Sequence, residues 1–393
     1  MHIVSMTAAV VRVPLKKKIT HASHSRHDSD NLIVRCTLDD GTVGYGEGVP
    51  RAYVTGETAE GALAMFAATP LADPLAATMN GWSDVVTACD TLRFTLDEPD
   101  PRGCHANALR CAVELSVLDA FGRHAGEPLH RVTGHVEGAE TIARQSDQVR
   151  YSTTITADSP AGERRSAAKM RLYGFHQCKI KVGMPGVDDS PRLRRLRRWL
   201  GRRVDIRLDA NEAWTPDQAA DQIRRLQPIG ATCIEQPIPH GDWQAMAALR
   251  QKVDTPIMLD ESLTSMPDAE QAVAHAACDL FNIRLSKCGG FLASLRLAAF
   301  ARRAGLGIQL GCHPGETGLL SAAGRHWATS VGDIRYLEGS YDRHLLVEPL
   351  TDPDITFRYG GRAKRIDRPG LGVDVDVDTL TRWQVGKAAE VRF

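Results

Sequence analysis

Five short charged motifs decide the fold of this chain, and each ends or follows an apolar run: KIKVG at 179–183, RLDANEAW at 207–214, CIEQP at 233–237, IMLDES at 257–262 and RLSKCGG at 284–290. Spacings of 28, 26, 25 and 27 residues separate their charged residues, which are Lys181, Asp209, Glu235, Asp260 and Lys287. A charged residue that recurs once per strand–helix unit indicates a repeated architecture.

The sequence around these motifs alternates between apolar runs and helical patterns from about residue 150 onward. We expect strands at 151–156, 176–182, 204–209, 232–235, 256–260, 279–285, 307–311 and 334–338. Helices are expected between them, for example at 215–227, 267–277, 291–304 and 316–329. Eight strands separated by helices predict a parallel sheet closed into a barrel, whose strand ends meet at one mouth. An open doubly wound sheet is the alternative, but it would gather polar residues at one switch point.

The first ~130 residues have an α+β pattern instead. Residues 2–13, 31–38 and 42–48 predict strands, the last two joined by a hairpin turn at Asp39-Asp40-Gly41. An apolar stripe over 106–121 predicts a helix that Gly122 and then Gly126-Glu127-Pro128 close. Near the C-terminus, the alternating stretch GVDVDVDTL predicts a strand that packs back on the N-terminal part.

Composition excludes several classes of protein. The 393 residues are 43% hydrophobic and 24% charged, as in soluble globular proteins. Lys plus Arg and Asp plus Glu both number 48, so the net charge of 0 gives no attraction to nucleic acid or anionic membranes. The nine Cys form no CxxC pair, which argues against a disulfide framework or a structural zinc site. With no signal peptide or long apolar run, a cytoplasmic protein is expected.

Three carboxylates stand at successive strand ends: Asp209, Glu235 and Asp260. In a low-dielectric barrel mouth they would repel one another unless a cation neutralised them. Oxygen-only ligands favour Mg²⁺, with Mn²⁺ as the substitute. The alternative, that each is an ordinary salt-bridge or cap residue, suits one Asp better than three matched positions.

Lysines complete the pattern. Lys179 and Lys181 alternate along one strand, so both side chains point to the same face. Two close, desolvated ammonium groups depress each other's pKa, which makes a neutral lysine base possible. Lys287 approaches from a strand on the far side. These parts suggest that a metal binds a substrate carboxylate and stabilises an enediolate while a lysine moves the α-proton.

The ordered motifs resemble the enolase superfamily, its mandelate racemase/muconate lactonizing enzyme family, and the muconate lactonizing enzyme subgroup within it. The segments GYGEG, DAFGRHAGEPLHRVTG and GLGVDVD also resemble that family. The resemblance implies a modified (β/α)7β TIM barrel with an N-terminal α+β capping domain. It places the capping domain at 1–130, completed by about 365–393, and the barrel with the active site at 135–360.

The resemblance also implies roles. Asp209, Glu235 and Asp260 would hold Mg²⁺, and Lys181 and Lys287 would be the acid/base catalysts, with Lys179 supporting Lys181. Asn211 and Glu261 would be partners of the metal site and of Lys287. Capping loops at about 18–30 and 45–57 would select a small carboxylate substrate. A homo-oligomer built from dimers, for example an octamer, is expected.

Two strand ends depart from the family pattern. In QLGCHPGETG, Glu316 would lie near the substrate carboxylate, while His313 is either a substrate contact or, as we favour, a loop or capping residue. In YLEGSYD, the Asp-x-Asp with which dipeptide epimerases typically hold an ammonium group is absent. Glu338 and Ser340 are the candidates to take over part of that role.

The capping loop contains His21, His24 and His27, which invites a metal site. A polar lid is the better interpretation, because no Cys or carboxylate completes a set of metal ligands with these histidines.

The leading function is a Mg²⁺-dependent isomerase that abstracts the α-proton of a carboxylate. It would be either a racemase or epimerase of an acyl amino acid or related acid, or a muconate-type cycloisomerase. The alternative is a dehydratase of a hydroxy acid or acid sugar, with His313 as the acid for the departing hydroxide. A catalytically inactive binding protein is a remote alternative, since all three carboxylates and all three lysines are present.

Overall fold

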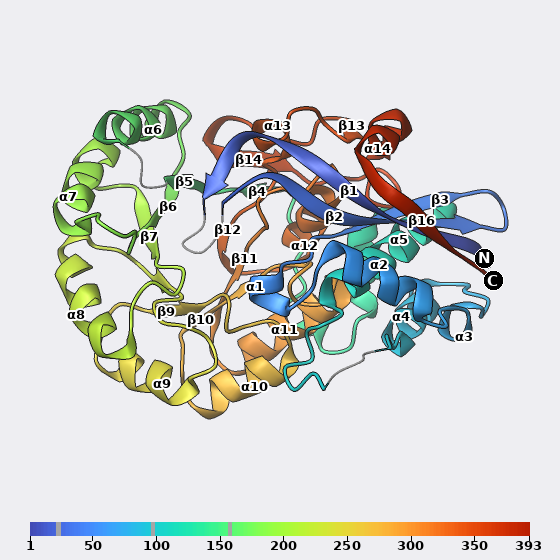
Figure 1. Ribbon diagram of the computed structural model, residues 1–393, viewed down its shortest axis with the longest axis horizontal. Coiled ribbons are helices and arrows are strands. Elements are labelled where there is room, and N and C mark those ends of the chain that lie inside the picture. Colours follow the sequence, from blue (N-terminus) through green and yellow to red (C-terminus); the bar gives the residue numbers. More distant parts are fainter. Residues whose placement is uncertain (21–24, 96–98, 156–158) are drawn as a thin grey trace.

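The computed structural model describes residues 1–20, 25–95, 99–155 and 159–393. A parallel sheet of eight strands, in chain order, surrounds the centre of the larger half (Figure 1). Its strands are β5 (Thr153–Ile155), β6 (Gln177–Lys181), β7 (Asp205–Asp209), β8 (Ile234–Glu235), β9 (Ile257–Leu259), β10 (Leu280–Ile283), β11 (Gly307–Leu310) and β12 (Ile334–Leu337). Ser152, just before β5, donates its backbone N–H to the Leu337 carbonyl of β12 over 2.8 Å, which joins the two edges of the sheet.

Seven helices alternate with these strands and form the outer ring in Figure 1. They are α6 (Pro160–Leu172), α7 (Asp189–Leu200), α8 (Pro216–Leu226), α9 (Trp243–Gln251), α10 (Met266–Ala274), α11 (Phe291–Arg303) and α12 (Gly318–Ser330). Several begin at a polar cap followed by proline: Ser159 accepts from the Gly162 N–H at the start of α6, for example. The fold is the predicted (β/α)7β barrel. None of the helices in the described ranges has the length and apolar character that crossing a membrane demands.

The capping domain is built on an antiparallel sheet in the order β16-β1-β2-β3. Its strands are β1 (Ile3–Thr20), β2 (Ser25–Leu38), β3 (Val43–Gly48) and β16 (Gln384–Arg392). Its helices are α1 (Ala52–Thr55), α2 (Ala59–Ala68), α3 (Ala72–Leu75), α4 (Trp82–Thr91) and α5 (Asn107–Ala125). The β1–β2 hairpin extends across to the barrel, where Leu15 bridges to Leu346 (Figure 1).

Short elements fill the connections. They are η1 (Leu129–His135), η2 (Ala139–Thr141), β4 (Gln148–Arg150), η3 (Gln227–Ile229), α13 (Asp342–Leu345), β13 (Thr351–Asp352), η4 (Tyr359–Gly361), β14 (Arg362–Lys364), β15 (Asp374–Val375) and α14 (Val377–Trp383). Strand β4 pairs with β14, and β13 pairs with β15.

Strand β3 packs directly on helix α5 because every second residue is glycine. A Cβ on Gly44, Gly46 or Gly48 would overlap backbone atoms of α5. The intervening Glu47 therefore points to the other face, which is toward the barrel. There its carboxylate accepts from the Thr317 N–H and hydroxyl and the Leu320 N–H at the start of α12.

Glu114 makes a second link of the same kind from α5. Its carboxylate accepts from the Phe291 and Leu292 N–H groups at the start of α11. Helix N-termini attract negative charge. Since these helices start just after the carboxyl ends of β10 and β11, the two carboxylates hold the capping domain over the barrel mouth.

Two local predictions are wrong in part. Helix α5 continues through Gly122, but it ends, as also predicted, at Gly126, whose φ is +69°. A Cβ on Gly122 would meet Glu127 and Gly370, so this glycine permits close packing rather than ending the helix. In GVDVDVDTL, the alternation gives only the short β15, because Asp376 accepts from two backbone N–H groups and starts α14. The strand that pairs with β1 is β16.

Candidate active site

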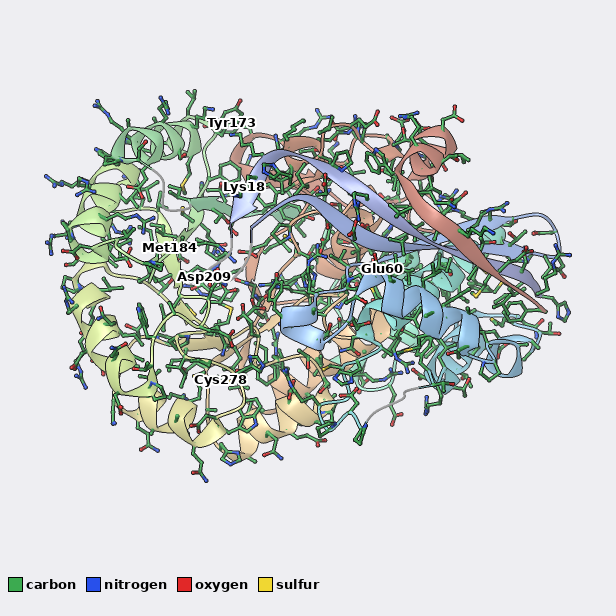
Figure 2. The ribbon with its side chains drawn as sticks, in the orientation of Figure 1. Lys18, Glu60, Tyr173, Met184, Asp209 and Cys278 are labelled. Atoms are coloured by element: carbon green, nitrogen blue, oxygen red, sulfur yellow. The ribbon has the colours of Figure 1, made fainter. Side chains whose placement is uncertain are left out.

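The five charged residues with regular spacing lie at the carboxyl ends of consecutive barrel strands. Lys181, Asp209 and Glu235 end β6, β7 and β8, while Asp260 and Lys287 follow β9 and β10. In the ring of eight strands, β6 and β10 are four positions apart, so the two lysines approach from opposite sides. The three carboxylates stand on the strands between them. Figure 2 labels Asp209 within the ring of barrel helices.

Lys179 lies at the centre of a carboxylate cluster. Its Nζ is 2.9 Å from Glu338 Oε1, 3.2 Å from Asp209 Oδ2 and 3.5 Å from Glu235 Oε1. Burial disfavours the ammonium form, but these carboxylates outweigh burial and raise the pKa of Lys179 well above its usual value. The predicted depression of the pKa is therefore wrong for Lys179, which is a fixed positive charge.

Lys181 has a different environment, although it is on the same strand and face. In the part of the chain that the structure describes, no ion pair or hydrogen bond of its ammonium group is found. Burial lowers the pKa of Lys181, and the neighbouring Lys179 adds to the effect while Asp209 opposes it. The predicted depression is right for Lys181, and this residue has the character of a base.

Lys287 is held firmly on the opposite side. Its Nζ donates to Asp260 Oδ1 over 2.8 Å, to the Asp260 carbonyl over 2.6 Å and to the Asn282 carbonyl over 2.9 Å. Burial alone would raise the pKa of Asp260, but Arg284 and Lys287 outweigh it and lower the pKa to about 2. The two side chains form a buried ion pair.

Two arginines of this network were not singled out from the sequence. Arg207 is fully buried and pairs with Glu338, while Arg284 pairs with Asp260 and lies 3.8 Å from Glu235 Oε1. Arg207 alternates with Asp209 just as Lys179 does with Lys181. The same alternation argument therefore placed it on the interior face and could have identified it.

The carboxylates fit a hard cation by donor type, with oxygen as the common ligand atom. Glu235 Oε2 is buried and has no hydrogen-bond partner, and burial raises the pKa of Glu235 to about 8. However, the oxygens of Asp209, Glu235 and Asp260 do not all lie within 4.8 Å of one another. Arg284 occupies one oxygen of Asp260. Lys287 contacts the other, so in this structure two protein cations neutralise Asp260.

The expected neighbours of the carboxylates are in place. The Asn211 backbone N–H donates to Asp209 Oδ1 over 3.2 Å, and Asn211 Nδ2 donates to Glu261 Oε1 over 3.4 Å. The residue after Glu235 also contributes, because Gln236 Oε1 accepts from the Asp260 N–H over 3.0 Å. These contacts orient the carboxylates; the roles predicted for Asn211 and Glu261 stay predictions.

His313 and Glu316 form a turn beyond β11. The His313 N–H donates to Glu316 Oε1 over 2.6 Å, and His313 Nδ1 is 3.7 Å from the same oxygen. Burial raises the pKa of Glu316 to about 8. A small cavity between β11 and β12 is lined by Glu316, Glu338, Cys312, Ser340 and Tyr151, among others. Glu316 thus lines this cavity, and its predicted place near the substrate carboxylate stays a prediction.

Glu338 and Ser340 are both engaged with the protein. Lys179 and Arg207 hold Glu338 and lower its pKa to about 2 against the opposing effect of burial. Ser340 donates to the Ile355 carbonyl and accepts from Arg325. Two protein cations thus balance the charge of Glu338, and the role predicted for Glu338 and Ser340 in holding a substrate ammonium group stays a prediction.

Of the three capping-loop histidines, His21 and His24 lie outside the described residues. His27 is exposed on β2 and belongs to no candidate metal cluster within the described ranges.

Comparisons with known proteins agree with this geometry. A family model described as Enolase C-terminal domain-like matches residues 163–379. N-succinyl-L-Arg/Lys racemase of Bacillus cereus is 29% identical over 389 residues, or 98% of both chains. L-Lys-D/L-Arg epimerase of Methylococcus capsulatus is 32% identical, covering 95% of this chain and 99% of that protein. Muconate cycloisomerase 1 of Rhodococcus opacus is 28% identical, with 97% and 98% covered.

Solved structures give the same result. The Bacillus cereus N-succinyl Arg/Lys racemase superposes with a TM-score of 0.85 at 26% identity over all of both chains. A Cytophaga hutchinsonii dipeptide epimerase complexed with Mg and the dipeptide D-Ala-L-Val gives 0.83 at 25% identity, covering 99% and 100%. The chain belongs to the enolase superfamily. Within it, the chain is a member of the mandelate racemase/muconate lactonizing enzyme family and an isomerase of that type.

Proposed function

We propose that this enzyme is a Mg²⁺-dependent racemase or epimerase of a small carboxylate, preferably an amino acid whose amino group is acylated. The observation that carries the proposal is the placement of Lys181 and Lys287 at opposite strand ends of one mouth. A substrate α-carbon between them would present one face to each lysine. That arrangement allows a proton to leave from one side and return from the other.

The two lysines suit complementary steps. Lys181, with its lowered pKa, takes the α-proton as a neutral amine. Lys287 carries protons that Asp260 and Asn282 hold in place, and it delivers one to the opposite face. For the other enantiomer the roles exchange. Lys179 keeps a permanent positive charge beside the carboxylates, which lowers their mutual repulsion.

Asp209, Glu235 and Asp260 are the residues that would hold Mg²⁺. When bound, the ion would neutralise negative charge that develops on the substrate carboxylate as the proton leaves. The orphaned Glu235 Oε2 and the Mg-complexed dipeptide epimerase support this assignment.

Local charge favours a substrate without a free ammonium group. At the end of β12, Lys179 and Arg207 neutralise Glu338, and the Asp-x-Asp of dipeptide epimerases is missing. An unpaired ammonium in this desolvated mouth would face fixed cations at a cost. An N-acyl group removes that charge, and the relative from Bacillus cereus is an N-succinyl-L-Arg/Lys racemase. A muconate-type diacid is the second candidate, supported by the cycloisomerase relative.

The test is α-proton exchange in heavy water with Mg²⁺ present. The substrates are both enantiomers of N-succinyl and N-acetyl amino acids, matched dipeptides with a free amino group, and cis,cis-muconate. We expect deuterium incorporation and racemisation of an acylated amino acid, with the free dipeptide much slower. Turnover of dipeptides at equal rates would contradict the preference for an acyl group. Dehydration of a hydroxy acid without exchange of acyl amino acids would replace the proposal with the lyase alternative.

A further inference from the structure

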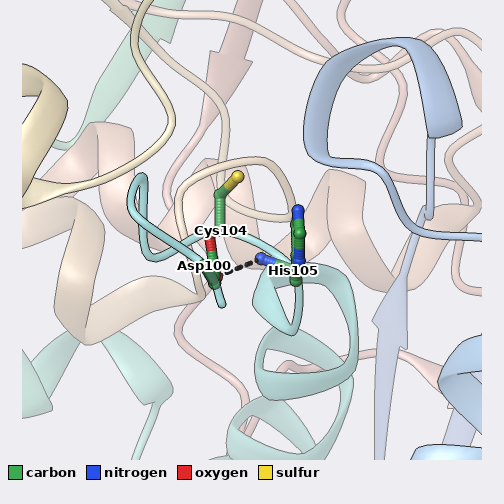
Figure 3. A group of neighbouring side chains, drawn as sticks. All are labelled: Asp100, Cys104 and His105. Atoms are coloured by element: carbon green, nitrogen blue, oxygen red, sulfur yellow. Dashed lines mark hydrogen bonds between the residues drawn. The ribbon is translucent and has the colours of Figure 1, made fainter. Parts of the chain in front are cut away.

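A second cluster of potential ligands lies outside the barrel mouth, in the connection between α4 and α5. One ligand atom each of Asp100, Cys104 and His105 comes within 4.8 Å of the others (Figure 3). No other group of three such residues with this spacing occurs in the described ranges. The sequence alone did not suggest it, because no CxxC or repeated His spacing marks the segment.

Backbone geometry positions Asp100 with one oxygen free. The Gly103 N–H donates to the Asp100 carbonyl over 3.1 Å, and Gly103 has a φ of +64° that closes the turn. The His105 N–H then donates to Asp100 Oδ2 over 2.8 Å, the dashed contact in Figure 3. The other oxygen, Oδ1, is buried and has no hydrogen-bond partner. A buried carboxylate oxygen without a partner is costly unless a donor or a cation binds it.

Cys104 supplies a thiol that no strong interaction uses. Its side chain is buried, and its contacts are weak sulfur hydrogen bonds, one with the Thr55 carbonyl at 3.9 Å and one with the Thr264 side chain. Asp100 and His105 are half-buried, so solvent can reach the cluster from their side. Burial raises the pKa of the Cys104 thiol to about 11, so the free protein keeps it protonated at neutral pH.

We propose that Asp100, Cys104 and His105 form a site for a borderline-soft divalent cation of the Zn²⁺ class, distinct from the Mg²⁺ site of the barrel. One sulfur, one imidazole nitrogen and one carboxylate oxygen are the donor types that Zn²⁺ accepts and Mg²⁺ does not. Tetrahedral Zn²⁺ requires sulfur and nitrogen ligands about 3.5 Å apart. The three ligand atoms lie within 4.8 Å of one another, so side-chain rotations that move each atom by about an ångström would bring them to this distance. A water molecule would take the fourth position.

The cation would act on the contact between the capping domain and the barrel. In the same loop, Arg102 pairs with Asp268 at 2.8 Å and donates to the Glu261 carbonyl at 2.9 Å. Asn107 donates to the carbonyls of Thr264 and Lys287, both at 2.7 Å. A bound ion that fixes this loop would therefore stabilise the backbone that carries Glu261 and Lys287. Binding releases the thiol proton, so affinity should rise with pH.

The test is titration of the full-length enzyme with Co²⁺ and Zn²⁺ in excess Mg²⁺, which occupies the oxygen-only site. We expect one equivalent of Co²⁺ to give thiolate-to-cobalt charge-transfer absorption, and Zn²⁺ to displace it and raise the melting temperature. Cys104→Ser should abolish the absorption, and Cys104→Ser, His105→Ala and Asp100→Asn should each weaken Zn²⁺ binding at least ~100-fold. Cys312→Ser is the control, because Cys312 is the one described cysteine that is not buried, and it should leave the absorption intact.

The outcomes are distinct. Absence of charge-transfer absorption in the wild-type enzyme, or its loss in Cys312→Ser but not Cys104→Ser, overturns the proposal. Tight Zn²⁺ binding that survives all three substitutions overturns it as well, because the ion then occupies the barrel carboxylates. If a substituted protein fails to fold, X-ray absorption of the Zn²⁺-loaded wild-type enzyme in excess Mg²⁺ answers instead. A sulfur ligand at about 2.3 Å from the ion supports the site, and a ligand set of oxygen and nitrogen without sulfur refutes it.

Discussion

Replacing the two lysines one at a time separates their roles most directly. The pair to compare is Lys181→Met and Lys287→Met, since methionine keeps much of the side-chain volume and removes the charge. In a racemase, each lysine serves one enantiomer. Lys181→Met should stop exchange of one enantiomer and leave some exchange of the other through Lys287, and Lys287→Met should show the opposite preference. Racemisation should disappear in both variants.

The structure also sets the size of each effect. Loss of a general acid or base slows the reaction by about 10²- to 10⁴-fold. Lys287 makes three hydrogen bonds, and breaking its buried pair with Asp260 should lower the free energy of unfolding by about 3–5 kcal/mol. Lys181 has no such partner in the described part of the chain, so its replacement should cost less than about 1 kcal/mol.

The assay is deuterium incorporation from heavy water, followed by NMR for each enantiomer of the best acylated substrate, beside urea unfolding of each variant. Lys287→Arg is the matched control, because it keeps the charge but not the position of the ammonium group. The reasoning is refuted if neither variant changes exchange, in which case His313 is the next candidate base. If only one variant loses exchange and the other shows no enantiomer preference, the enzyme is a cycloisomerase or a dehydratase rather than a racemase.

Three further predictions follow from the same contacts. Removal of divalent cations by a chelator should abolish exchange and leave the circular dichroism unchanged, and Mg²⁺ should restore activity; full activity after chelation would exclude the metal site. The pKa values of Asp260 and Glu338 are lowered to about 2, from ordinary values of 3.8 and 4.5. The stability that these two carboxylates contribute is therefore fully present above about pH 4.5 and is lost as the pH falls toward 2. Urea midpoints should decline over that window, and Glu338→Gln should flatten the decline. Glu47→Ala removes the carboxylate that accepts from the Thr317 and Leu320 N–H groups and from Asn31, so the free energy of unfolding should drop by about 3 kcal/mol. The control is Glu60→Ala, because Glu60 is exposed on α2 and its replacement should change the free energy of unfolding by less than about 0.5 kcal/mol.

The repeated pattern of apolar runs and charged ends was enough to predict the barrel. Each strand of the barrel is short and largely buried, so apolar residues recur in it, as Ile206 and Leu208 do in β7 and Leu280, Phe281 and Ile283 in β10, and polar residues mark its end. Because parallel strands all point the same way, the regular spacing of Lys181 through Lys287 also predicted which residues share the mouth. Alternation placed Lys179 and Lys181 on one face.

Local sequence misled where several conformations fit the same pattern. The alternation in GVDVDVDTL suits a strand, but Asp376 satisfies the first N–H groups of α14 and the chain turns into a helix instead. Gly122 is a helix terminator by type, yet here close packing against Gly370 requires it inside α5.

Charge state was decided by tertiary structure alone. Lys179 and Lys181 are identical by sequence pattern, but Lys179 lies among three carboxylates and Lys181 faces none at ion-pair distance in the described residues, so their pKa values shift in opposite directions. The two pKa values depend on the distances from each lysine to charged groups on other strands. The spacing of residues along one strand does not give those distances. Asp100, Cys104 and His105 are near one another in sequence, but only the turn of the α4–α5 connection shows that their side chains meet.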